Sequence, residues 1–413
     1  MVHGGSIQAV ASRWGGTRRI VAAIATFVVV AYVVAFAGRI YARKYYIFLP
    51  DYVSWAATPA PTPTGPVHLF VLFADHFEPN EVETLKGGGQ LGKEAEAAAA
   101  MRVRSWGERY ADLASRHRDS NGRPPRHTWF YPGEQEAPAV LSEFEPLVRH
   151  GLGEVELHFH HEGDTEATLA PKLAAAIKSF QKHGFLITRD GRTHFAFVHG
   201  NFALDSGNPQ YCGLTEEIRL LRNLGCFADF TFPSVFLESQ PPFVNSIYAA
   251  KDDGEPKSYK RRFALSTLVD GTSDLMMFQG PLVFAPTTSL RRLLLALDDG
   301  DVHPGMPAEK GRIDRWIRAN VHVPERPDWV FIKLFAHGIS SPAEEEAVLG
   351  SDFDNLLTAF EKNYNDGNRY VLHYVTAREA YNLAISAASG AKGAPEHYFD
   401  TPIPPYLASM QDN

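Results

Sequence analysis

The feature of this 413-residue chain that most constrains its fold is the alternation of strand-like and helix-like segments after residue 66. Val67–Ala74 (VHLFVLFA) is a nearly unbroken apolar run of strand length, which is typical of a strand buried on both faces of a parallel sheet. Further strands are predicted at Thr128–Tyr131, Glu154–His160, His194–Val198, Phe227–Phe232, Leu275–Phe284, Trp329–Leu334 and Arg369–Tyr374, with helices at Glu94–His117, Ala137–Arg149, Ala167–His183, Thr215–Leu224, Arg312–Asn320, Asp354–Tyr364 and Ala377–Ala387. This alternation predicts parallel βαβ units, and about seven strands favour a (β/α) barrel over an open doubly wound sheet.

An uncharged apolar segment, Ile20–Gly38, precedes the alternating region. Its 19 residues are enough to cross about 30 Å of hydrocarbon as a helix, and they exceed the roughly 7–15 residues of a signal-peptide core. We therefore expect a single retained transmembrane helix, although Ala35-Phe36-Ala37 resembles a cleavage site and keeps a cleaved signal open. Three basic residues on each side leave the positive-inside rule silent. The aromatic residues Tyr41, Tyr45, Tyr46 and Trp55 beyond the segment suit an interfacial aromatic belt on the far side. We expect the domain that follows to lie outside the cytoplasm.

Changes in composition along the sequence divide the chain into five segments. We expect an N-terminal tail (1–19), the membrane anchor (20–38), a juxtamembrane segment with a Pro/Thr-rich linker (39–66), the barrel (67–390) and a C-terminal tail (391–413). Ala57–Pro66 (ATPAPTPTGP) favours extended polyproline structure and predicts a stiff spacer. The formal net charge of −8 gives no reason to expect nucleic acid as a partner. The two cysteines, Cys212 and Cys226, lack the spacing of a zinc or redox motif, and two separate buried thiols are favoured over a disulfide.

Chemically capable side chains follow several predicted strands, where functional residues of parallel α/β folds gather. Asp75 and His76 come directly after the first strand and offer a base and a metal ligand. His158 and His160 alternate along a later strand, so they share one face and can bind a single ion, whereas His161 should point elsewhere. Imidazole ligands suit zinc and other late divalent metals.

Two further strand ends carry polar groups. His199, Asn201 and Asp205 follow the strand at 194–198 and could contact a hydroxyl-rich substrate, although a glycine turn with local backbone bonds explains them nearly as well. Asp229 is a weaker candidate of the same kind. His337 follows the strand at 329–334 and is well placed as a general acid. The chain has no nucleophile elbow, no Walker loop, no H-E-x-x-H helix and no Rossmann fingerprint directly after a predicted strand, so the expected chemistry is that of a metal-activated water.

At these residues the sequence resembles the polysaccharide deacetylase (NodB-homology) superfamily, over roughly Val67–Ala387. More closely, it is similar to a divergent branch whose members carry segments like His199-Gly200-Asn201-Phe202-Ala203-Leu204-Asp205, Cys226-Phe227-Ala228-Asp229-Phe230-Thr231 and Tyr374-Val375-Thr376-Ala377-Arg378-Glu379. The resemblance implies a distorted (β/α)7-type barrel. The sequence departs from the superfamily pattern at three places. Asp75-His76 stands where the superfamily has an Asp-Asp pair, and His158-x-His160 stands where it has two histidines four residues apart. The segment Phe197-Val198-His199-Gly200 lacks the arginine that the superfamily carries there.

The resemblance also implies a reaction: the removal of acetyl groups from a polysaccharide or glycan. A divalent ion, zinc first and cobalt or nickel as alternatives, would be held by His76, His158 and His160, with Asp75 as the base and His337 as the acid. In an alternative assignment, Asp75 is the metal ligand and His76 contacts this ligand instead of the ion. Two rival interpretations remain. One is a catalytically inactive barrel that binds polysaccharide, and the other is a glycoside hydrolase that pairs Asp75 with Asp229 or Asp205.

Overall fold

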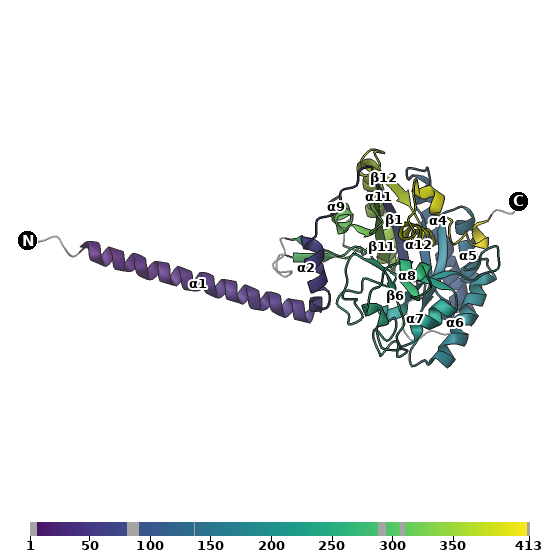
Figure 1. Cartoon of the computed structure of the whole chain (residues 1–413), viewed down its shortest axis with the longest axis horizontal. Coiled ribbons are helices and arrows are strands. Elements are labelled where there is room, and N and C mark those ends of the chain that lie inside the picture. The colour runs from purple at the N-terminus through teal and green to yellow at the C-terminus, as the bar shows by residue number, and fades with distance from the viewer. Residues whose placement is uncertain (1–5, 81–90, 136, 288–294, 306–309, 411–413) are drawn as a thin grey trace, which may run out of the picture.

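The computed structural model of the chain describes residues 6–80, 91–135, 137–287, 295–305 and 310–410 (Figure 1). It shows a mixed α/β fold built on one large, mostly parallel sheet. The strands are β1 (Val67–His76), β2 (His127–Pro132), β3 (Gly153–Phe159), β4 (Phe195–His199), β5 (Cys226–Asp229), β6 (Ile247–Ala250), β7 (Leu275–Phe278), β8 (Val283–Pro286), β9 (Leu295–Asp298), β10 (Val321–Val323), β11 (Arg326–Ala336) and β12 (Tyr370–Tyr374). The helices are α1 (Ser6–Ala42), α2 (Leu49–Ala57), α4 (Lys93–Ser115), α5 (Pro138–Arg149), α6 (Glu166–Gln181), α7 (Glu217–Asn223), α8 (Ser266–Val269), α9 (Lys310–Ala319), α10 (Pro342–Leu349), α11 (Ser351–Asn363) and α12 (Ala377–Ala388).

The sheet has ten strands in the order β10-β11-β1-β2-β3-β4-β5-β7-β6, with β12 paired to β1 in addition. Strand β1 pairs with β11 along one side, while its amino half pairs with β12 and its carboxyl half with β2 on the other. All these pairs are parallel except β10–β11 and β6–β7. The predicted parallel α/β fold is therefore confirmed. The described strands pair in an open order from β10 to β6, so the closed (β/α)7 barrel stays a prediction.

The two faces of β1 carry different packing, because successive side chains of a strand point to opposite sides. Leu69, Val71 and Phe73 belong to a cluster with residues of α4 and α5 on the outer face. Phe70, Leu72 and Ala74 belong to an inner cluster. In that inner cluster the rings of Phe278 on β7 and Phe331 on β11 lie 5.3 Å apart between centroids. Strands distant in the sheet order thus meet across the inner face, which shows that the sheet is strongly curled.

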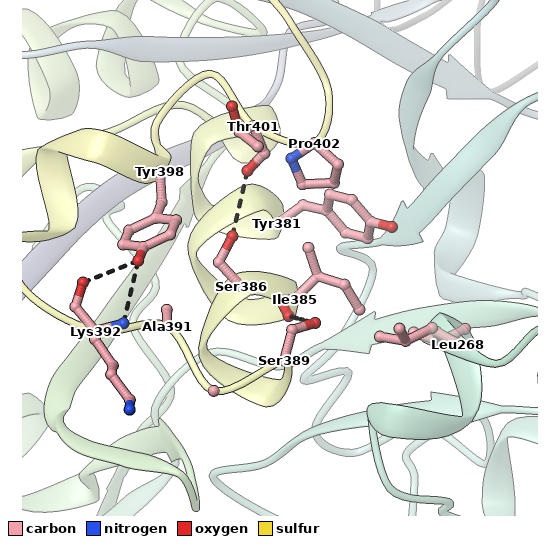
Figure 2. A pocket seen from close by; sticks show the side chains of 12 residues that line it. Leu268, Tyr381, Ile385, Ser386, Ser389, Ala391, Lys392, Tyr398, Thr401 and Pro402 are labelled. Atoms are coloured by element: carbon pink, nitrogen blue, oxygen red, sulfur yellow. Dashed lines mark hydrogen bonds between the residues drawn. The ribbon is translucent and has the colours of Figure 1, made fainter.

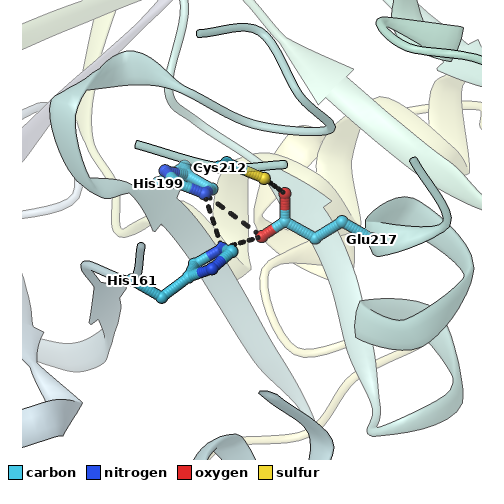
Figure 3. A group of neighbouring side chains, drawn as sticks. All are labelled: His161, His199, Cys212 and Glu217. Carbon is cyan, nitrogen blue, oxygen red and sulfur yellow. Dashed lines mark hydrogen bonds and ion pairs between the residues drawn. The ribbon is translucent and has the colours of Figure 1, made fainter. Parts of the chain in front are cut away.

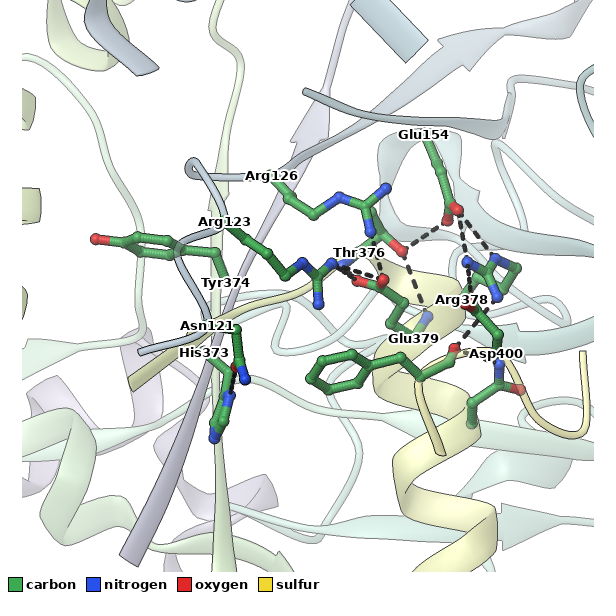
Figure 4. Close-up of polar contacts among 12 residues, drawn as sticks. Asn121, Arg123, Arg126, Glu154, His373, Tyr374, Thr376, Arg378, Glu379 and Asp400 are labelled. Atoms are coloured by element: carbon green, nitrogen blue, oxygen red, sulfur yellow. Dashed lines mark hydrogen bonds and ion pairs between the residues drawn. The ribbon is translucent and has the colours of Figure 1, made fainter. Parts of the chain in front are cut away.

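Helix α12 covers the amino ends of the strands. Its apolar residues Ala380, Leu383 and Ala384 belong to the inner cluster. The amide of Ala377 donates to the hydroxyl of Thr128 at 3.0 Å, near the start of β2. Arg378 binds Glu154, near the start of β3, in a buried polar network (Figure 4). With the amino ends covered, the carboxyl ends of the strands are the place where a ligand can meet the sheet.

Helix α1 projects from the rest of the molecule (Figure 1). Its residues Arg18–Ala42 are long and apolar enough to cross a membrane, with a hydropathy of 2.7, and none of that stretch is buried in the protein. A signal sequence has the same properties. The helix begins at Ser6, well before the predicted start at Ile20, and so includes most of the predicted tail.

The chain on both sides of the predicted barrel packs against it. Tyr45 and Phe48 are buried beside Val244 and Leu282, and the amide of Val244 donates to Asp51 of α2 at 3.0 Å. The segment before residue 58 is thus packed on the domain. Residues 58–66 connect α2 to β1 within the folded part of the chain. At the other end, buried Phe399, Ile403 and Tyr406 lie within the predicted C-terminal tail. The tail has this structure because the chain after α12 completes the cover of the amino ends, where the carbonyl of Ile403 accepts from Arg378.

Candidate functional site

Three side chains from the carboxyl ends of β1 and β3 converge at one edge of the sheet. A carboxylate oxygen of Glu78 and one ring nitrogen each of His158 and His160 all lie within 4.8 Å of one another. Nε2 of His158 is 2.6 Å from Oε1 of Glu78, and Nε2 of His160 is 3.5 Å from the same oxygen. All three residues are buried. His158 and His160 share one face of the strand end, as their spacing predicts, and His161 points to a different group of residues.

The outer ring nitrogens of both histidines are held by acceptors. Nδ1 of His158 donates to the carbonyl of Val198 at 2.8 Å, and Nδ1 of His160 donates to Glu134 at 2.9 Å. With its N–H on Nδ1, a neutral imidazole has a lone pair on Nε2 that can bind an ion, and without an ion Nε2 of His158 hydrogen-bonds to Glu78 instead. Histidines that bind metals are oriented in this way by partners on their other nitrogen.

This donor set fits a divalent ion. Burial raises the pKa of Glu78, but the hydrogen bond from His158 and the charges of His158, His160 and His337 lower it to about 2, so the carboxylate is ionised at neutral pH. Two imidazoles and one carboxylate are the protein ligands of several catalytic zinc sites, which keep a further position open for water or substrate.

Replacing Glu134 by alanine is expected to weaken metal binding by about 10- to 100-fold, because His160 would lose the acceptor that orients its ring. Glutamine at the same position keeps a carbonyl acceptor and should weaken binding much less. Competition with a metal indicator would measure both variants. Equal affinities for the alanine variant and the unchanged protein would show that packing alone orients the ring.

Two more histidines flank the triad formed by Glu78, His158 and His160. The ring of His76 lies 5.3 Å from that of His158 and 4.8 Å from that of His337, measured between centroids. Burial and the neighbouring histidines lower the pKa of His76 well below its usual range. His337 is only half-buried and comes directly after β11. The predicted ligand His76 therefore lies beside the triad, and the carboxylate within it is Glu78, which sequence reasoning missed. The signal was present in the segment Asp75-His76-Phe77-Glu78.

Asp75, predicted as the base, points away from these histidines. Its Oδ1 accepts from the amide of Gly338 at 2.7 Å, and its Oδ2 lies 2.9 Å from Nε2 of His127. The residue is fully buried. Because Gly338 follows His337, the carboxylate ties the end of β1 to the backbone that carries His337.

Gly200 lies directly against the triad, and a side chain there would displace His160. A Cβ atom at this position would lie 2.2 Å from Cδ2 of His160. Replacing Gly200 by alanine is therefore expected to cut metal occupancy and any metal-dependent activity by about tenfold or more, since His160 must move. Gly163 is a matched control, because no atom lies within 4 Å of a Cβ there, although its positive φ adds some strain. Metal analysis of both purified variants would check this. Full occupancy in the Gly200 variant would contradict the close packing.

The predicted substrate-binding residues are mostly engaged inside the fold. Asp205 accepts from the amide of Ser258 at 2.7 Å. Asp229 accepts from the amide and hydroxyl of Thr231 at 3.0 and 2.7 Å, and burial raises its pKa. His199 belongs to the group around His161. Asn201 is half-buried. Their role toward a substrate stays a prediction.

A cavity of about 660 Å³ lies on the covered side of the fold, between α8, α12 and the C-terminal segment (Figure 2). Tyr381 and Ile385 of α12 form part of its wall, and Tyr398 binds the backbone of Lys392 at its rim. None of the residues that line it carries an imidazole or a carboxylate. The triad therefore remains the stronger candidate for chemistry.

Comparison with known proteins leaves the family open. No protein-family model matches the chain, and no curated protein matches it. A solved structure that is similar is that of a protein from Mycobacterium smegmatis, provisionally assigned as a polysaccharide deacetylase. The two share 15% sequence identity with a TM-score of 0.39, over 76% of this chain and 90% of that one. A likeness of this strength says nothing about the site.

Proposed function

We propose that this chain is a metal-dependent hydrolase that removes acetyl groups from a polysaccharide or glycan. The observation that carries the proposal is the convergence of Glu78, His158 and His160, with the outer nitrogen of each histidine held by an acceptor. The acetyl group and the sugar rest on the resemblance of the strand-end motifs to the deacetylase superfamily.

Glu78, His158 and His160 would hold the ion, with zinc preferred over cobalt or nickel. When bound, such an ion supplies an acidified water and polarises the acyl oxygen. His337 is the proton donor to the leaving amine or alkoxide, because it is half-buried and its ring lies beside that of His76. His76, between His158 and His337, is the group that takes up the proton of the attacking water. Asp75 positions His337 through the amide of Gly338.

The proposal includes a membrane location. Helix α1 would be the retained anchor of a single-pass protein whose catalytic domain lies outside the cytoplasm. The two parts of this statement are tested separately. Resistance to alkaline extraction with an intact N-terminus supports the anchor, and cleavage of the domain by protease added to intact cells supports the orientation.

The test of the hydrolase uses the full chain purified in detergent. We expect release of acetate from N- or O-acetylated oligosaccharides, loss of this activity on chelation and its return with zinc or cobalt. Metal bound at the triad without acetate release from any such glycan would favour an inactive polysaccharide-binding fold. A glycoside hydrolase is disfavoured by the contacts of its candidate carboxylates, since Asp75, Asp205 and Asp229 each accept hydrogen bonds from backbone amides.

A further inference from the structure

A second group of ligand-capable side chains lies behind the first. It consists of His161 after β3, His199 at the end of β4, Cys212 in the connection that follows, and Glu217 at the start of α7 (Figure 3). One ligand atom from each lies within 4.8 Å of all the others. All four residues are buried, and Cys212 is a free cysteine. Four potential ligands from separate segments thus enclose one point in the interior.

Three distances, between His161, His199 and one oxygen of Glu217, are close to the edges of a tetrahedral site. Nε2 of His161 lies 3.0 Å from Nε2 of His199, and each is 3.3 Å from Oε1 of Glu217. Sγ of Cys212 is 3.3 Å from Oε2 of Glu217. Bonds of about 2.0–2.3 Å in a tetrahedral zinc site place neighbouring ligand atoms about 3.3–3.6 Å apart. A small contraction or expansion of the group would therefore accommodate the ion.

The surrounding hydrogen bonds orient these side chains toward one another. Nδ1 of His199 donates to the carbonyl of Gly200 at 2.5 Å, which leaves Nε2 as the nitrogen that faces Glu217 and can bind an ion. The amide of Ser206 donates to Sγ of Cys212 at 3.3 Å, and the amide of Asp205 donates to Glu217 at 2.6 Å. These backbone donors suit a thiolate and a carboxylate, whose two negative charges a divalent cation would balance.

We propose that His161, His199, Cys212 and Glu217 bind a divalent metal ion, zinc by preference, in a closed structural site. Four protein ligands that are all buried leave no position for a substrate, which is the arrangement of structural rather than catalytic zinc. The thiolate and imidazole ligands favour zinc over magnesium or calcium. This proposal does not rest on the hydrolase activity proposed above.

The second ion would shape the loop that lines the first site. Asn201, Phe202, Asp205 and Ser206 all have positive φ, a backbone conformation that non-glycine residues rarely adopt, so the loop needs support from outside itself. The ring of Phe202 lies 5.3 Å from that of His76, measured between centroids. Ligands at both ends of the loop, His199 and Glu217, would provide that support.

The test is cobalt spectroscopy on the full chain in detergent, after chelation and reloading with Co²⁺. We expect a thiolate-to-cobalt charge-transfer band in the near ultraviolet. The band should disappear in Cys212→Ser and persist in Cys226→Ser, which alters the other buried thiol. It should also persist in the double variant His158→Ala/His160→Ala, which removes ligands of the first site only. The absence of the band from the unchanged protein, or its survival in Cys212→Ser, would overturn the proposal.

Metal stoichiometry gives a second readout that does not depend on the folding of the cysteine variant. We expect two zinc ions per unchanged chain and one in His158→Ala/His160→Ala, with sulfur in the X-ray absorption spectrum of the ion that remains. Complete loss of metal from that double variant would overturn the proposal. A chain that shows the cobalt band but releases no acetate would contradict only the hydrolase.

Discussion

Replacing Glu78 by glutamine is expected to remove most of the metal from the triad and to lower kcat/KM for acetate release by about 10²–10³-fold. The substitution keeps the size of the side chain but removes the negative charge on which Nε2 of both His158 and His160 converge. Metal analysis and acetate release, measured on the same preparations, would check both parts.

Two controls test whether the effect is specific to Glu78. Glu162→Gln alters an exposed carboxylate near the same strand end and should change neither quantity by more than about twofold. His76→Ala should leave the metal bound while impairing turnover, because His76 lies beside the triad. If His76→Ala loses the metal and Glu78→Gln keeps it, then the ligand set inferred from the sequence is the right one.

Replacing Arg378 by methionine is expected to lower the free energy of unfolding by about 3–5 kcal/mol, because the variant leaves the buried carboxylate of Glu154 without its charged partner. In the unchanged protein, Nε and Nη2 of Arg378 donate to Oε1 of Glu154 at 2.9 and 2.8 Å, and Nη1 donates to the carbonyl of Ile403 (Figure 4). Denaturant unfolding followed by circular dichroism would measure the change.

The matched control removes both charges of the pair. Glu154→Gln/Arg378→Met should be clearly more stable than Arg378→Met alone, since glutamine keeps an acceptor for the hydroxyl of Thr376 and carries no buried charge. If the double variant is no more stable than the single one, then the hydrogen bonds of Arg378 to the C-terminal segment, rather than the ion pair, provide the stability.

Much of the fold could be predicted because its main elements have strong local patterns. The apolar run of β1 and the helical periodicity of α4 place both elements within a few residues of their observed bounds. Strands β6 and β10 were missed, because segments of three or four residues owe their conformation to pairing with β7 and β11 rather than to their own sequence. Helix α2 was missed beside the proline-rich stretch that dominates its neighbourhood.

The candidate site could be predicted only where it lies on a strand. The period of two along β3 brings His158 and His160 together. Glu78 lies beyond the end of β1, where the path of the chain, not a period, sets the direction of a side chain. Cys212 and Glu217 come from a loop and a short helix that only the tertiary fold brings to His161 and His199.

The packed junction between α1 and the domain limits where the domain can work. Only a short turn with Tyr45 buried in it separates α1 from α2. Helix α2 is held by two hydrogen bonds: the amide of Phe284 donates to the hydroxyl of Tyr52, and the indole N–H of Trp55 donates to the carbonyl of Ala319. A domain joined in this way has little freedom to move relative to α1. With α1 in a bilayer, the triad would keep a constant distance from the membrane surface, so the proposed hydrolase would select glycans by their height above the membrane as well as by their chemistry.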